Sequence, residues 1–112
     1  MSHYYDKFGV KITREAWREL FQNFNYRIVG KDEATGVSTV WLGLDHRYDE
    51  TVGHPLIFET LCQGEVLTDE MMRYSTLEQA EAGHAEMVRR VRAATPVPRR
   101  LLNSVRARGR KR

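Results

Sequence analysis

The chain has 112 residues, 41% of them hydrophobic and 29% charged, with a formal net charge of +3 and a single cysteine, Cys62. This length and composition suit one globular domain, and no apolar run approaches the roughly 20 residues that a membrane helix needs. One cysteine excludes an internal disulfide and a cysteine-based zinc site, so we expect a reducing cytoplasm and no membrane partner.

The first quarter of the chain predicts an extended segment followed by a helix. Residues 5–12 suit a short extended segment with a turn. Thr13 can cap the free N–H groups of a helix start, which places the helix directly after it. The helix is expected to end near residues 23–25. Its apolar face would carry five side chains, namely Ala16, Trp17, Leu20, Phe21 and Phe24.

The middle of the chain predicts three strands. Residues 26–29 favour a strand that ends in a polar turn over 31–36. The strongest strand signal is at 37–44, because β-branched and aromatic residues suit a pleated, buried surface. After a polar loop over 45–54, residues 55–62 predict another strand.

A second helix is predicted near the end of the domain. Residues 64–73 read as a connection with a helical turn around 69–72. Ser75 and Glu78 have the spacing of a capping box at a helix start. The prolines of residues 95–98 end this helix, because a proline donates no N–H. The apolar face of the helix would carry Leu77, Ala80, His84, Met87, Val88 and Val91.

These elements together predict an α+β fold, with a small antiparallel sheet of three to four strands packed with two helices. The strand–strand–helix order favours segregated layers over parallel βαβ units. We expect residues 1–95 to form the single domain and residues 96–112 to form a basic C-terminal tail. The aromatic residues fit one small core better than a base-stacking platform; they are Trp17, Phe21, Phe24, Trp41 and Phe58.

The charges divide the chain into two unlike parts. Residues 1–88 hold eight basic and all fifteen acidic side chains, a formal charge of −7, while residues 89–112 hold ten basic side chains and no acidic one. Such asymmetry favours a polyanionic partner or a tail that docks on its own body. The predicted nucleic-acid-binding residues are Arg99, Arg100, Arg106, Arg108, Arg110, Lys111 and Arg112.

A weak candidate for metal binding lies around the 45–54 loop. Antiparallel pairing across this loop would bring His46 and His54 together, with Asp45 nearby. Two imidazoles and a carboxylate are ligands that divalent ions accept. The alternative is that these groups hydrogen-bond each other and hold no metal. No short ligand motif fixes the geometry, so we predict no metal site and no cofactor.

Two further polar residues lie in apolar surroundings. Glu59, inside a predicted strand, suits acid–base chemistry if its pKa is raised, or else an exposed face or a basic partner. His84, on the apolar helix face, suits a packed residue with one hydrogen bond, or else a ligand or acid–base role. Cys62 reads as a small core residue. We therefore predict no catalytic residue, although an enzyme is not excluded.

A resemblance to a known family covers residues 4–91. The sequence resembles a family of small proteins common in tailed-phage and prophage genomes, with no established activity. The resemblance implies a bacterial host cell as the setting and supplies no catalytic residues. The basic tail lies outside the family pattern. The strings that carry the resemblance lie at 5–9, 15–17, 37–46, 55–60, 73–76, 78–80 and 83–84.

Three functional hypotheses follow. The first is a non-enzymatic phage or prophage accessory protein whose arginine-rich tail contacts nucleic acid. The second is a protein–protein interaction module, such as an inhibitor of a host factor, that uses the acidic body. The third and weakest is a metal-dependent enzyme built on Asp45, His46, His54 and Glu59.

Overall fold

The computed structural model describes residues 3–95, so the predicted basic tail and its nucleic-acid-binding residues lie outside the described part of the chain. The elements are β1 (Tyr4–Tyr5), β2 (Lys11–Ile12), α1 (Arg14–Gln22), α2 (Phe24–Arg27), β3 (Ile28–Asp32), β4 (Val37–Trp41), β5 (Phe58–Cys62), β6 (Met71–Tyr74) and α3 (Leu77–Ala94). The fold is α+β, as predicted. An antiparallel sheet has the strand order β3-β4-β5-β6, and β1 and β2 pair separately.

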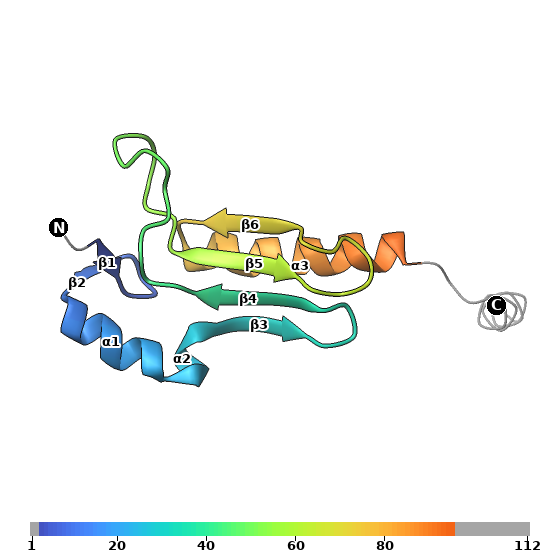
Figure 1. The fold of residues 1–112 in the computed structure, drawn as a ribbon, viewed down its shortest axis with the longest axis horizontal. Coiled ribbons are helices and arrows are strands. Elements are labelled where there is room, and N and C mark those ends of the chain that lie inside the picture. Colours follow the sequence, from blue (N-terminus) through green and yellow to red (C-terminus); the bar gives the residue numbers. More distant parts are fainter. Residues whose placement is uncertain (1–2, 96–112) are drawn as a thin grey trace, which may run out of the picture.

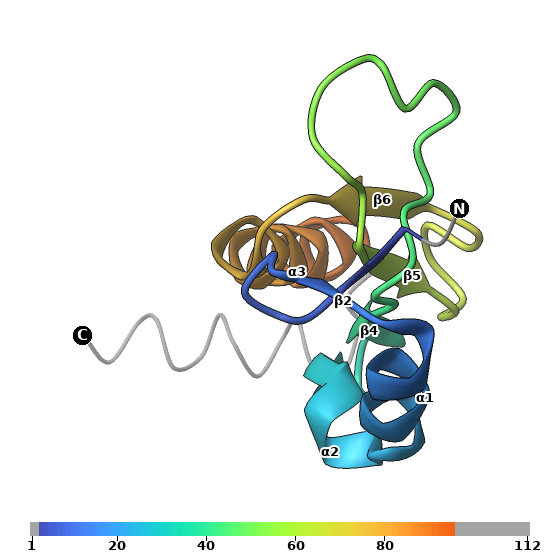
Figure 2. The same cartoon turned by 90° about the vertical axis from the view of Figure 1, so that its left-hand side faces the viewer.

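The helices are distributed unevenly around the sheet. α3 runs along one face of the four strands and contacts all of them (Figures 1 and 2). α1 and α2 lie beside the start of β3, at the end of the sheet where the β1–β2 hairpin also lies (Figure 1). The connection over residues 42–57, between β4 and β5, projects from the same end as a long loop (Figure 2).

Strict alternation on the two central strands builds the core. Every second residue of β4 and of β5 is buried, because successive side chains of a strand point to opposite faces. The buried side chains are Val37, Thr39, Trp41, Phe58, Thr60 and Cys62. Four of the six are apolar, and the two threonines lie in the middle of each strand.

The apolar side chains form two clusters, one at each end of this face. At one end, Val37 and Cys62 pack against Met87 and Val91 of α3. At the other end, Trp41 and Phe58 pack against Ala80 of α3. Around the second cluster lie half-buried side chains of the N-terminal elements, including Tyr5, Trp17, Leu20, Phe21 and Tyr26. Of the five aromatic residues predicted to form the core, Trp41 and Phe58 are buried and Trp17 and Phe21 pack beside them, whereas Phe24 is 61% exposed.

The first predicted helix is confirmed, whereas the strand predicted after it begins too early. Thr13 caps α1 by accepting a hydrogen bond from the backbone N–H of Ala16. Asn23 then caps a second, one-turn helix through the N–H of Tyr26. Tyr26 and Arg27 are therefore helical, and β3 runs from residue 28 into the segment predicted as a turn.

The two central strands are shorter than predicted. β4 ends at Trp41 because the N–H groups of Leu42 and Gly43 both donate to the carbonyl of Ile57, at 2.8 and 3.2 Å, which interrupts the regular ladder. Leu44 instead forms an isolated bridge with Tyr4. β5 begins at residue 58 and not at 55.

The helical turn predicted around residues 69–72 is wrong. Residues 71–74 form β6, an edge strand that pairs with β5 in antiparallel register, with Glu59 opposite Arg73. The two methionines of β6 are 43% and 50% exposed. Because little of this strand is buried, it lacks the β-branched, alternating pattern that marks a central strand.

The capping box of α3 lies one residue later than predicted. The hydroxyl of Thr76, not that of Ser75, accepts a hydrogen bond from the N–H of Gln79, the third helical residue. The side chain of Gln79 in turn accepts a hydrogen bond from the N–H of Thr76. Overlapping Ser and Thr boxes fit the same sequence, so spacing alone did not distinguish them. The predicted end is confirmed, since Thr95 forms the C-cap.

Candidate functional site

Three polar side chains cross the middle of the buried face, between the two apolar clusters. Thr39 and Thr60 face each other on β4 and β5, and their hydroxyl groups share a hydrogen bond of 2.5 Å. The Thr39 hydroxyl also lies 2.8 Å from Nδ1 of His84, on α3. We call Thr39, Thr60 and His84 the polar strip. It satisfies hydroxyl groups that burial would otherwise leave without a partner.

His84 is a half-buried residue of this strip, with one side-chain hydrogen bond within the described residues. Burial lowers the pKa of its imidazole below the ordinary value of 6.5, and Asp32 only partly opposes this effect. The ring packs so closely on β3 that a Cβ added to Gly30 would lie 2.7 Å from it. Thr39 is fully buried, so its hydrogen bond with Nδ1 of His84 lies inside the core.

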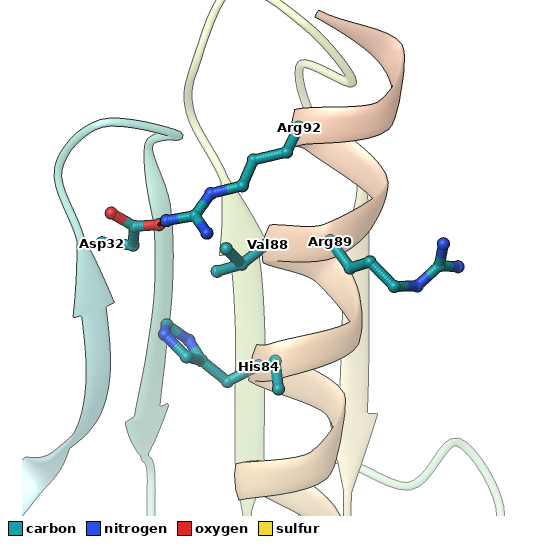
Figure 3. A pocket seen from close by; sticks show the side chains of 6 residues that line it. Asp32, His84, Val88, Arg89 and Arg92 are labelled. Atoms are coloured by element: carbon teal, nitrogen blue, oxygen red, sulfur yellow. Dashed lines mark hydrogen bonds and ion pairs between the residues drawn. The ribbon is translucent and has the colours of Figure 1, made fainter. Parts of the chain in front are cut away.

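A shallow hollow of about 510 Å³ opens beside His84, between α3 and the end of β3 (Figure 3). Its charged groups neutralise one another. Nη2 of Arg92 lies 3.5 Å from Oδ2 of Asp32 across the opening. Arg89 points away from the hollow in Figure 3 and pairs with Glu86 at 2.6 Å. No excess of one charge is left here to select an ion.

Asp45, a candidate metal ligand, is instead a structural clamp in the long loop. Its side chain is 0% exposed and lies 2.7 Å from the guanidinium of Arg47. Oδ1 accepts hydrogen bonds from the backbone N–H groups of Arg47 and Leu56, both at 3.0 Å. Burial alone would raise the pKa of Asp45, but these hydrogen bonds outweigh it and hold the pKa below 3.8. Both oxygens of this carboxylate therefore have partners within the domain.

The two candidate histidines of the loop do not form a metal site with Asp45. His46 donates its backbone N–H to the carbonyl of Leu56, and the carbonyl of His54 accepts from the hydroxyl of Ser75 at 3.4 Å. Within residues 3–95, no three His, Cys, Asp or Glu side chains are placed so that they could hold a metal ion. One backbone hydrogen bond, from His46 to Leu56, crosses the base of the loop, but the β4–β5 pairing ends at Trp41 and Phe58 and does not continue through the loop.

Glu59 and Cys62 also have structural partners. Glu59 pairs with Arg73 on the neighbouring strand at 3.4 Å, which is the basic partner that the sequence left as an alternative. Cys62 is fully buried, and its thiol lies 3.3 Å from the carbonyl of Val66. Neither residue has the surroundings of a catalytic group.

The three arginines of α3 are all paired with carboxylates of the body. Arg89 pairs with Glu86, Arg90 with Glu70 at 3.6 Å, and Arg92 with Asp32. Hydrogen bonding between the two side chains raises the pKa of Arg89 above its ordinary value and lowers the pKa of Glu86 below its ordinary value of 4.5. Three of the ten basic side chains after residue 88 thus form ion pairs within the domain.

The sequence matches no family model, and comparison with curated proteins and with solved structures gives no significant match. None of the helices within residues 3–95 is both long and apolar enough to cross a membrane. The fold and its polar groups define a small α+β domain with a four-stranded antiparallel sheet. The side chains of Asp45, Glu59 and His84 all have partners within that domain.

Proposed function

We propose that the protein is a non-enzymatic phage or prophage accessory protein whose arginine-rich segment contacts nucleic acid. The observation that carries this proposal is the difference in charge composition on the two sides of Thr95. Before it, the three basic residues after position 88 are engaged with carboxylates of the body. After it, residues 96–112 contain seven cations and no carboxylate. The phage setting rests on the sequence resemblance alone.

The chemistry of the seven cations suits a phosphate backbone. Six of them are arginines, whose planar guanidinium groups make paired contacts to phosphate oxygens and keep their charge at any cellular pH. Neutralising several phosphates releases counterions, which gives strong, largely sequence-independent and salt-sensitive binding. The proposed contact residues are Arg99, Arg100, Arg106, Arg108, Arg110, Lys111 and Arg112.

A salt titration tests this proposal. Binding of a fluorescent single-stranded oligonucleotide would be followed by anisotropy between 50 and 200 mM salt. If all seven cations contact phosphate, log Kd changes with log salt concentration with a slope of about 5, so affinity falls about a thousandfold over this range. Affinity that does not respond to salt, or that survives deletion of residues 96–112, contradicts the proposal.

A matched pair of variants separates tail contacts from general charge. Arg110→Gln with Arg112→Gln removes two proposed phosphate contacts and should lower the salt slope by about 1.4. Arg14→Gln with Arg18→Gln removes two exposed arginines from α1 and should leave the slope unchanged. Equal effects of the two variants would show that the tail has no special role.

The second candidate function, a protein–protein interaction module that uses the acidic body, has one observation in its favour. β6 is an edge strand of the sheet, and its Met71 and Met72 are 43% and 50% exposed. An open edge offers backbone groups for pairing with a partner strand. Met71→Lys with Met72→Lys should then abolish capture of a host protein by residues 1–95. Capture that tolerates both lysines contradicts this use of the edge.

A further inference from the structure

A second hollow lies where the described chain ends. It has a volume of about 390 Å³ and is bounded by the β3–β4 turn, the β5–β6 loop and the last turns of α3. Val66 and Val91 form an apolar part of its lining, and Thr95 lies on its rim. We call it the terminal hollow. Residue 96 therefore begins at the edge of this hollow.

The walls of the terminal hollow are held in place by the backbone. The two loops touch at Gly36 and Gly64, so closely that a Cβ on Gly36 would lie 2.5 Å from the N atom of Gly64. The N–H of Gln63 donates to the carbonyl of Gly36 at 2.9 Å, across the same junction. On the helix side, Thr95 bonds back to the carbonyl of Val91 through its N–H and its hydroxyl. The hollow is thus formed before anything enters it.

Two carboxylates line the terminal hollow, Glu33 from the turn and Glu65 from the loop. We call them the rim glutamates. Both are exposed, and within residues 3–95 neither has a basic side chain within 4.0 Å. Their neighbours Asp32 and Glu70 differ, because each is paired with an arginine of α3. The rim glutamates thus suit a cationic occupant.

The chain itself supplies such an occupant within reach. Thr95 already has extended backbone angles, φ −75° and ψ 123°, and residues 96–100 read Pro-Val-Pro-Arg-Arg. Residues before proline favour extended conformations. Four extended residues span at most about 14 Å, so Arg99 begins no farther than that from Thr95. The first two cations of the tail can therefore reach across a hollow of this size.

We propose that residues 96–100 fold back into the terminal hollow, where Arg99 and Arg100 pair with the rim glutamates. Val97 then packs on the apolar part of the lining. The same two guanidinium groups are withheld from phosphate while they are docked, so the body competes with nucleic acid for the tail. This competition rests on the proposed function; the docking does not.

The strength of the contact fits a competitor that nucleic acid displaces. Exposed ion pairs are individually weak and are screened by salt. Two of them shift the docking equilibrium by about twofold to thirtyfold, and affinity for a polyanion falls by the undocked fraction. A strand that engages all seven cations outweighs this effect. Docking therefore weakens binding without preventing it.

Nuclear magnetic resonance of the full chain without nucleic acid tests the docking. The amide signals of Gly36 and Gly64 are the probes. They should move when Arg99 and Arg100 are changed to Ala, and high salt should move the wild-type signals in the same direction. The variant R110A/R112A, with the same loss of charge farther along the chain, should leave them nearly in place. Unchanged signals in R99A/R100A overturn the docking.

Oligonucleotide affinity of the full chain tests the competition. Glu33→Gln with Glu65→Gln should strengthen binding by about twofold to thirtyfold at low salt. The control E78Q/E81Q removes two exposed carboxylates at the other end of α3, about 21 to 26 Å from Thr95. Equal gains in the two variants overturn the competition. If no variant binds the oligonucleotide, the proposed function fails, and the amide signals still decide the docking.

Discussion

The polar strip provides the sharpest test of the structure, through removal of one hydroxyl at a time. Thr39 is its central member, because its hydroxyl contacts both Thr60 and His84. Thr39→Val keeps the shape of the side chain but leaves two buried polar groups without a partner. Each stranded group costs about 1–2 kcal/mol, so we expect a loss of about 2–4 kcal/mol in the free energy of unfolding.

Thr60 is a terminal member, so its replacement should cost less. Thr60→Val removes one hydrogen bond while Thr39 keeps its contact with His84, and we expect a loss of about 0.5–1.5 kcal/mol. The double variant should cost about 1–2 kcal/mol less than the sum of the two single losses, because the Thr60 hydroxyl is no longer left without a partner. Urea denaturation followed by circular dichroism measures all three values.

Two results would refute this reasoning. Equal losses in the two single variants would mean that Thr39 is not the shared partner. A double variant whose loss equals the sum of the single losses would mean that the hydroxyl groups act independently. Leu20→Ala, in the half-buried layer around the second apolar cluster, is a control whose effect should add to that of Thr39→Val.

Three further predictions concern pH, the loop clamp and the core. Burial holds the pKa of His84 below 6.5 in the folded protein. As the pH falls through 6.5, the unfolded chain therefore binds more protons than the folded protein, and the free energy of unfolding should drop between pH 7 and 5. His84→Gln should flatten this dependence in urea titrations, and an unchanged slope would assign it to other groups. Asp45→Ala should cost about 2–3 kcal/mol and speed proteolytic cleavage of the 42–57 connection, because it strands Arg47 and the N–H of Leu56; cleavage at the wild-type rate would contradict the clamp. Met87 is 2% exposed, so Met87→Ala should lower the free energy of unfolding by about 2–5 kcal/mol in the same urea assay. Phe8 is 79% exposed, so Phe8→Ala should change it by less than about 0.5 kcal/mol. Similar losses in the two variants would show that Met87 is not a core residue.

Local chemistry and pattern predicted the elements whose signals are self-contained. Thr13 caps the first helix because its hydroxyl needs only the N–H three residues ahead. The strands β4 and β5 were predicted from their residue types, but the face of β4 that α3 buries, with Val37, Thr39 and Trp41, was not. The fold class followed from these elements. β6 was missed because Met71 and Met72 lie on an exposed edge, where no burial pattern is required.

The partners of the candidate site residues depend on tertiary contacts, which no short spacing encodes. His84 was singled out from its apolar helix face, and its single hydrogen bond was one of the readings considered. Its partner Thr39 is 45 residues away and was not identified. The only available signal was that Thr39 and Thr60 interrupt otherwise apolar strand faces. Arg47 was overlooked in the same way, although it follows Asp45 by two residues.

The polar strip also fixes how far α3 can slide along the sheet. Apolar side chains tolerate small displacements, because a methyl group packs about equally well on several neighbours. Hydrogen bonds do not, and a shift of one helical turn, about 5.4 Å, would carry His84 out of reach of Thr39. With an apolar cluster on either side, the hydrogen bonds of the strip fix a single register of α3 on the sheet. The position of Thr95, and with it the point from which the basic segment leaves the domain, is set by three polar side chains in the middle of the core.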